Sequence, residues 1–171
     1  MKVINFHYSF LKVKIMKRKQ TPSRRKPRLG SICAGSFRNQ DLIPEFWQTL
    51  YEYAPRIAKR IAKENGYTEN VTDDYYETET ADGLRFSLYD ALNEVAERVP
   101  FAYFGSCEDD DLGFGFWVCS LDFAEEVLHC SNDMRSPNRK ELSGYSYYAT
   151  VTDHGNVTLF YKNHREVWSV V

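Results

Sequence analysis

The first 40 residues contain no aspartate or glutamate, although they contain 11 lysines and arginines. Residues 41–171 have the opposite balance: 11 basic residues against 24 acidic ones give a net charge of −13, which the chain total of −2 conceals. Such an asymmetry predicts a basic tail on an acidic body. A basic tail attracts nucleic acid or anionic lipid, whereas an acidic body repels both and favours a basic protein surface.

Long apolar segments are also missing. No segment approaches the length of a membrane span, and Lys12 and Lys14 interrupt the only early apolar run, which argues against a secretory signal. The four cysteines are far apart in the sequence, so we expect a soluble, reduced, cytoplasmic protein with free thiols. A bridge between Cys107 and Cys119 is the alternative in an oxidising compartment.

Sequence signatures of catalysis and of cofactor binding are absent as well. No G-x-G-x-x-G or Walker sequence occurs, so we expect no nucleotide cofactor. Cys107, Cys119, His129 and Cys130 lack the paired C-x-x-C spacing of a zinc motif, so we predict no metal site. Nothing matches a serine or cysteine hydrolase signature, which favours a protein that is not an enzyme.

Two regions are predicted. Residues 1–29 form a basic extension that cannot bury enough apolar surface to be ordered alone, and residues 30–171 form one α+β domain. Met16 begins a second N-terminus-like sequence, so we expect that residues 1–15 arise from an upstream start codon. An amphipathic targeting presequence is the alternative.

The domain is expected to centre on an aromatic hairpin. Phe101–Phe104 and Phe114–Val118 are typical of two antiparallel strands, with the acids of residues 108–111 at the tip. Gly113 and Gly115 share a face with Trp117, which predicts close approach by another backbone or ring. Those acids lack the spacing of a calcium loop, so we interpret them as a solvated tip rather than a cation site.

The remaining elements follow from periodicity and turn residues. A short buried strand is predicted at residues 30–37, and a principal helix follows from about Pro44, with a kink or break near Tyr53 because Pro55 cannot continue it. An acidic loop is predicted at 67–83, with a short strand suggested near Tyr75–Thr78, and a helix is predicted to start at Ser87. A short helix is predicted at Leu121–His129 and a three-stranded meander over 145–171.

Together these elements predict an α+β fold with a five- to six-stranded, mainly antiparallel sheet. Two main helices pack on one face of this sheet, and a short third helix is added.

Several phrases resemble small uncharacterised proteins of bacteriophages and plasmids. They are GSFRNQDLIPEFW, PFAYFGSCEDDDLGFGFW and DHGNVTLFY…REVWSVV, and the similarity covers about residues 30–171. The resemblance implies an accessory protein of a mobile element, a type of protein that often binds host proteins, including defence nucleases. It transfers no catalytic residues to this chain.

Three functional hypotheses follow. The first is a non-enzymatic protein that binds a basic host surface through two acidic clusters: Asp73, Asp74, Glu77, Glu79, Glu108, Asp109, Asp110 and Asp111. The second is nucleic-acid binding through a basic arm: Lys17, Arg18, Lys19, Arg24, Arg25, Lys26 and Arg28. The third is a metal-dependent enzyme.

Overall fold

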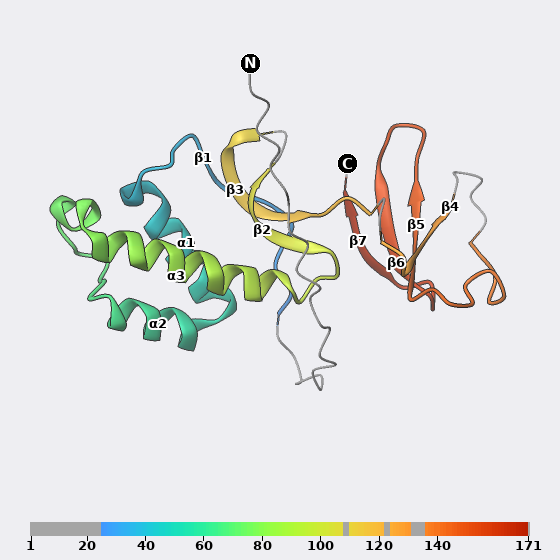
Figure 1. Ribbon diagram of the computed structural model, residues 1–171, viewed down its shortest axis with the longest axis horizontal. Coiled ribbons are helices and arrows are strands. Elements are labelled where there is room, and N and C mark those ends of the chain that lie inside the picture. Colours follow the sequence, from blue (N-terminus) through green and yellow to red (C-terminus); the bar gives the residue numbers. More distant parts are fainter. Residues whose placement is uncertain (1–24, 108–109, 122–123, 131–135, 171) are drawn as a thin grey trace, which may run out of the picture.

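A computed structural model describes residues 25–107, 110–121, 124–130 and 136–170. The fold is α+β, as predicted, but it contains two sheets rather than one (Figure 1). The first part comprises β1 (Gly30–Ala34), α1 (Asn39–Tyr53), α2 (Pro55–Glu64), the 3-10 helix η1 (Asp73–Glu77), α3 (Glu79–Ala96), β2 (Ala102–Cys107) and β3 (Asp110–Val118). The second comprises β4 (Val127–Cys130), β5 (Tyr147–Val151), β6 (Val157–Tyr161) and β7 (Glu166–Val170).

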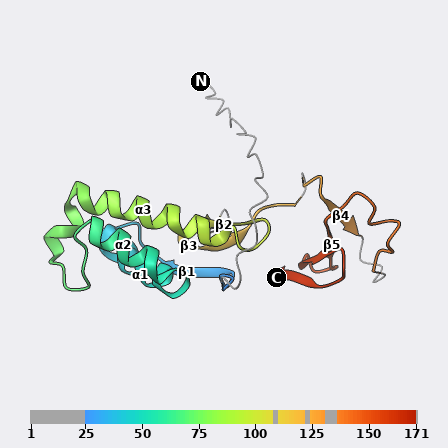
Figure 2. The same ribbon diagram turned by 90° about the horizontal axis from the view of Figure 1, so that it is seen from below.

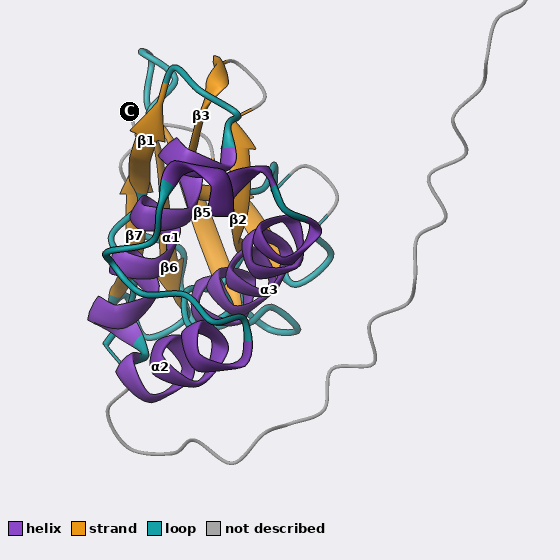
Figure 3. Cartoon of the chain, turned by 90° about the vertical axis from the view of Figure 1, so that its left-hand side faces the viewer, coloured by secondary structure: helices purple, strands orange, loops and turns teal. Residues whose placement is uncertain are grey.

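The three helices lie together on one side of an antiparallel sheet with the strand order β1-β3-β2, as Figure 3 shows. Apolar residues at helical spacing on α1 and α3 meet the aromatic residues of β2 and β3 in one core. Phe46 of α1 is 1% exposed and packs edge-to-face on Phe104, with ring centroids 5.1 Å apart. The predicted aromatic hairpin therefore forms the face of the sheet against which the helices pack.

The predicted break of the principal helix is confirmed. Helix α1 ends at Tyr53, and Ala54 leaves the helical region with φ −147° and ψ 63°. Pro55 then starts α2, where its missing N–H is not needed. The break lets α2 fold back beside α1 and bury Ala58, Ile61 and Ala62.

Helix α3 begins eight residues before the predicted start at Ser87. Thr78 is its N-cap, and the Thr78 hydroxyl accepts a hydrogen bond from the backbone N–H of Ala81 at 3.2 Å. Residues 67–83 are thus not one acidic loop, because they contain η1 and the first turn of α3. The short strand suggested near Tyr75–Thr78 is wrong for the same reason.

The close approach predicted from the glycines is confirmed at Gly115. Strand β1 pairs antiparallel with β3, and Ser31 faces Gly115 in the ladder. A Cβ atom on Gly115 would lie 2.8 Å from the Cα of Ser31 and even closer to the carbonyl of Gly30. The missing side chain therefore lets β1 lie against β3. Strand β1 is only partly buried, unlike the buried strand predicted there.

The C-terminal meander forms as predicted, but it does not extend the hairpin sheet. Strands β5, β6 and β7 pair antiparallel, and β4 joins β5 in parallel to complete a second sheet with the order β4-β5-β6-β7. The short helix predicted at Leu121–His129 is wrong, because residues 127–130 form β4. Hence the described strands are seven rather than five or six, and three helices rather than two cover the first sheet.

The second sheet has its own core and lies beside the helical part (Figure 2). Trp168 and Leu159 pack in this core with Val99, which follows α3. The indole N–H of Trp168 donates to the carbonyl of Pro100 at 2.9 Å. One hydrogen bond and a small apolar cluster therefore connect the two parts at the end of α3. Among the described residues, no helix is both long and apolar enough to span a membrane.

Candidate functional site

The exposed face of α3 has acidic side chains along its whole length. Seen along the helix axis, these residues lie opposite the buried stripe of Ala81, Leu84, Leu88 and Leu92. We define the α3 acidic face by six exposed residues: Glu79, Asp82, Phe86, Asp90, Glu94 and Glu97. The helix has 18 residues and is therefore about 27 Å long, which is long enough to span a protein interface.

The charges at the two ends of this face have different effects on the helix. Glu79 and Asp82 lie in the first turn, where carboxylates complement the positive end of the helix dipole. Glu94 and Glu97 lie at the last turn, which contains no basic residue, so they oppose the dipole there. Asp90 and Glu94 are four residues apart and repel each other. Glu79 and Asp82 therefore stabilise the helix, whereas Asp90, Glu94 and Glu97 do not.

An exposed aromatic ring lies in the middle of these carboxylates. Phe86 is 61% exposed, the largest exposure among the large apolar side chains that the structure describes. The guanidinium of Arg85 lies 5.0 Å from the centre of its ring and 3.9 Å from Asp82. An exposed aromatic side chain within a charged rim is the arrangement that protein interfaces use at their centres.

The 3-10 helix η1 adds three exposed acids just before α3. Its tyrosines point inward, and the hydroxyl of Tyr75 donates to the carbonyl of Asn65 at 3.0 Å, which leaves Asp73, Asp74 and Glu77 in solvent. The side-chain amide of Asn39 donates to the carbonyl of Tyr76 at 3.1 Å and also to Asp82 at 2.8 Å. Because Asn39 is the first residue of α1, these bonds hold η1 and the first turn of α3 together at the start of α1.

The second acidic cluster predicted from the sequence lies on a different element. Asp110 and Asp111 begin β3, while Glu108 and Asp109 lie outside the described residues. Figure 1 shows the start of α3 at the left-hand end of the molecule and β3 near the middle. The structure therefore brings together Asp73, Asp74, Glu77 and Glu79, and it places the β3 acids elsewhere.

The basic arm enters the described part of the chain at Arg25. Lys17, Arg18, Lys19 and Arg24 lie outside the described residues, whereas the other three arm residues contact the body. Arg25 pairs with Glu52 at 2.7 Å, and the Lys26 ammonium lies 5.9 Å from the ring centre of Tyr161. The backbone N–H of Arg28 donates to the hydroxyl of Tyr53 at 3.1 Å.

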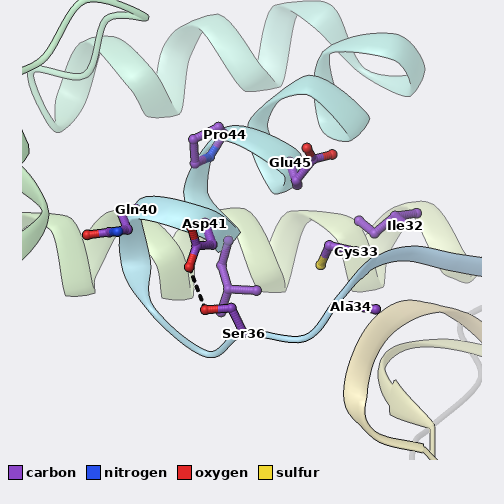
Figure 4. A pocket seen from close by; sticks show the side chains of 9 residues that line it. Ile32, Cys33, Ala34, Ser36, Gln40, Asp41, Pro44 and Glu45 are labelled. Carbon is purple, nitrogen blue, oxygen red and sulfur yellow. Dashed lines mark hydrogen bonds between the residues drawn. The ribbon is translucent and has the colours of Figure 1, made fainter.

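A cavity lies between β1 and the start of α1 (Figure 4). Its volume is about 560 Å³, and it opens to solvent. Its polar and sulfur-containing side chains are those of Cys33, Ser36, Gln40, Asp41 and Glu45. These side chains are the ones to test for nucleophilic chemistry.

Polar groups of this cavity are engaged in hydrogen bonds around the start of α1. Burial, the largest cause, and the nearby carboxylate of Glu45 raise the pKa of the Cys33 thiol, although a backbone hydrogen bond acts in the opposite direction. The hydroxyl of Ser36 donates to Asp41 at 2.5 Å, and Arg38 donates to the same oxygen at 2.9 Å. These two bonds lower the pKa of Asp41, which makes it a weak base. The cavity thus holds a protonated thiol and a carboxylate that accepts two hydrogen bonds at the start of α1, and none of these side chains is an activated nucleophile.

A smaller cavity of about 240 Å³ lies between the end of β3 and the second sheet. Cys119 and His129 both line it, and the Nε2–H of His129 donates to the carbonyl of Leu121 at 3.0 Å. Cys33 and Cys130 are free thiols, and the side chain of Cys107, the other half of the alternative bridge to Cys119, lies outside the part of the chain that the structure describes. No group of three or more potential metal ligands occurs among the described residues.

Comparison with known proteins gives no family for this chain: no protein-family model, no curated protein and no solved structure matches it. The resemblance to phage and plasmid proteins therefore stays a prediction.

Sequence reasoning missed most of the α3 acidic face. It placed Glu79 in a loop, and it did not group Asp90, Glu94 and Glu97 as a surface because the helix was expected to start at Ser87. The signal was present in the spacing, since positions 79, 82, 86, 90, 94 and 97 follow one face of a helix. Recognising Thr78 as an N-cap reveals that face from the sequence.

Proposed function

We propose that this chain is a non-enzymatic accessory protein of a mobile element that binds a basic surface of a host protein. The observation that carries the proposal is the α3 acidic face, with its exposed Phe86 between carboxylates. The partner has a positively charged surface, of the kind that otherwise holds nucleic acid, with an apolar pocket for the ring. Asp73, Asp74 and Glu77 extend the contact from η1, and the acids at residues 108–111 contribute to the negative field.

Two physical arguments support a partner with a basic surface. In the unbound protein the acids at the end of α3 repel each other and oppose the helix dipole, so they destabilise the helix. A bound cationic surface attracts the same carboxylates, so they stabilise the complex. Long-range attraction also steers a basic partner toward the acidic body and makes association sensitive to salt, because screening acts over about 8 Å at physiological ionic strength. Phe86 then provides the short-range apolar contact, and truncation of such an anchor costs about 2 kcal/mol or more of binding free energy.

Site-specific cross-linking tests the proposal. A photo-activated aromatic amino acid is placed at Phe86 or, as a control, at the exposed Val151 of the second sheet. After irradiation in host-cell lysate, adducts are identified by mass spectrometry, and the captured protein is purified and titrated by calorimetry. We expect an adduct from position 86 only, with a protein that has a basic surface.

Charge variants decide whether the α3 acidic face holds that partner. The triple variant Asp90→Asn, Glu94→Gln, Glu97→Gln is compared with Glu125→Gln, Glu126→Gln, Glu166→Gln, which removes the same charge from other exposed positions. We expect at least a tenfold weaker affinity for the first variant, about 1.4 kcal/mol, and little change for the second. Equal effects of both variants, a partner without a basic surface, or no specific adduct would each refute the proposal.

The eight acids predicted from the sequence are tested separately. Neutralising Asp73, Asp74, Glu77, Glu79 and the four acids at 108–111 together is expected to weaken partner capture. Unchanged capture would refute the proposal that these acids hold the partner.

A further inference from the structure

Helix α2 has a surface of the opposite sign to α3. Its exposed face consists of Arg56, Lys59, Arg60 and Lys63, which follow the i, i+3, i+4, i+7 spacing of one helix side. Ala58, Ile61 and Ala62 on the opposite side are buried against the rest of the helical layer. We call these four basic residues the α2 basic face.

This concentration of cations is unfavourable for α2 itself. The first turn contains Arg56 and no acid, so a positive side chain lies at the positive end of the helix dipole. The four cations are three or four residues apart and repel one another. Their one ion pair with a described residue joins Arg60 to Glu64 at 4.0 Å, and both side chains are about two-thirds exposed, so it offsets little of this repulsion. A bound polyanion removes both penalties.

The basic arm reaches the body next to this helix. Tyr53 lies two residues before α2, and its hydroxyl accepts a hydrogen bond from the backbone N–H of Arg28. The guanidinium of Arg98 donates to the carbonyl of Tyr53 at 3.2 Å and to that of Arg25 at 2.9 Å. Pro27 is buried between these contacts. The arm is therefore held at the junction of α1 and α2, where the α2 basic face begins.

From this arrangement we propose that the α2 basic face binds the phosphate backbone of a nucleic-acid duplex. The four cations extend over about 10 Å of helix, which is close to the width of about 12 Å between the phosphate rims of a B-DNA major groove. No large apolar or aromatic side chain is exposed on α2, so this face offers cations to phosphates and no ring to stack on bases.

The same absence argues against a lipid surface as the ligand. A helix that binds in the membrane interface inserts an apolar face, and the apolar face of α2 is buried within the protein. The proposal is independent of the proposed function, because it concerns a different helix and the opposite charge. Repulsion between the α3 acidic face and phosphates then restricts the duplex to the side of α2.

Fluorescence anisotropy with a labelled DNA duplex of about two helical turns tests this inference on the full chain. A duplex RNA of equal length and anionic phospholipid vesicles serve as further probes. The variant is Arg56→Gln, Lys59→Gln, Arg60→Gln, Lys63→Gln. The matched control removes four exposed cations from the second part of the chain: Arg139→Gln, Lys140→Gln, Lys162→Gln, Arg165→Gln.

We expect the α2 variant to bind duplex at least tenfold more weakly at about 100 mM salt, with the slope of log K against log salt reduced by about three. The control should stay within about twofold, because its cations make no phosphate contact. Duplex RNA should bind more weakly than duplex DNA, because its major groove is narrower than the B-DNA groove that the four cations match. Equal losses in both variants, no loss in the α2 variant, or binding to vesicles but not to duplex would overturn the proposal.

Discussion

At the residue scale, Gly115 shows how one missing side chain positions a strand. Two glycines beside Trp117 predicted a close approach, and the approaching backbone is that of β1. The sequence identified the feature but not the neighbour, because Ser31 of β1 and Gly115 of β3 are 84 residues apart along the chain. Which strand fills such a space is decided by tertiary packing.

Replacing this glycine should therefore destabilise the first sheet. In Gly115→Ala the new Cβ meets the β1 backbone at Gly30 and Ser31, so β1 must shift at a cost of about 1–3 kcal/mol. Urea denaturation measures the free energy of unfolding. Gly83→Ala is the control: it lies in exposed α3, where a Cβ has its nearest neighbour at 3.9 Å, and we expect a gain of about 0.5–1 kcal/mol. Similar destabilisation by both changes would contradict this account of β1.

Tyr67 predicts a loss of stability at alkaline pH. The residue is 7% exposed, and burial, with a further contribution from Tyr76, raises its pKa above the ordinary value of 10.0. Above about pH 10 the unfolded chain releases this phenolic proton while the folded chain retains it, so the free energy of unfolding falls as pH rises.

The Tyr67→Phe variant removes the titrating group. Between pH 9 and pH 11, about one unit either side of the ordinary tyrosine value, its thermal midpoint should decline less steeply than that of the parent chain. Circular dichroism measures the two midpoints. Parallel declines would show that other groups control alkaline unfolding.

At the scale of elements, local signals were sufficient where one residue determines the outcome. Pro55 predicted the end of α1, and alternating residues between turns predicted the meander of β5, β6 and β7. The strand β4 could not be predicted in this way. The segment around it has apolar residues at helical spacing, and its strand conformation depends on parallel pairing with β5, which lies 17 residues or more further along the chain.

Thr78 determines where α3 begins, so its removal should weaken that helix. In Thr78→Ala the N–H of Ala81 loses its side-chain acceptor, and the expected cost is about 1 kcal/mol of unfolding free energy. Thr78→Ser retains the hydroxyl and should be close to the parent. Thr80→Ala, at an exposed position two residues later, controls for the loss of a threonine. Equal costs for the changes at 78 and 80 would show that the cap has no special role.

At the scale of the whole molecule, the sequence predicted the net charge of each region but not the surfaces on which the charged side chains lie. The division between a basic tail and an acidic body was visible in the residue counts. The opposite charges of α2 and α3 were not, because both helices belong to the acidic body and their charged faces emerge only when helix boundaries are known. The separation into two sheets was also missed, since it depends on contacts such as that between Trp168 and Pro100.

We propose that the α3 acidic face is the surface that meets a cationic partner. Titration of the labelled full chain with a short arginine-rich peptide, followed by two-dimensional NMR of the backbone amides, tests it most directly. The account predicts that shift changes concentrate on residues 73–97, around the α3 acidic face, and that they disappear in the triple variant at Asp90, Glu94 and Glu97. Changes spread evenly over all exposed acids, or centred on the second sheet, would contradict it.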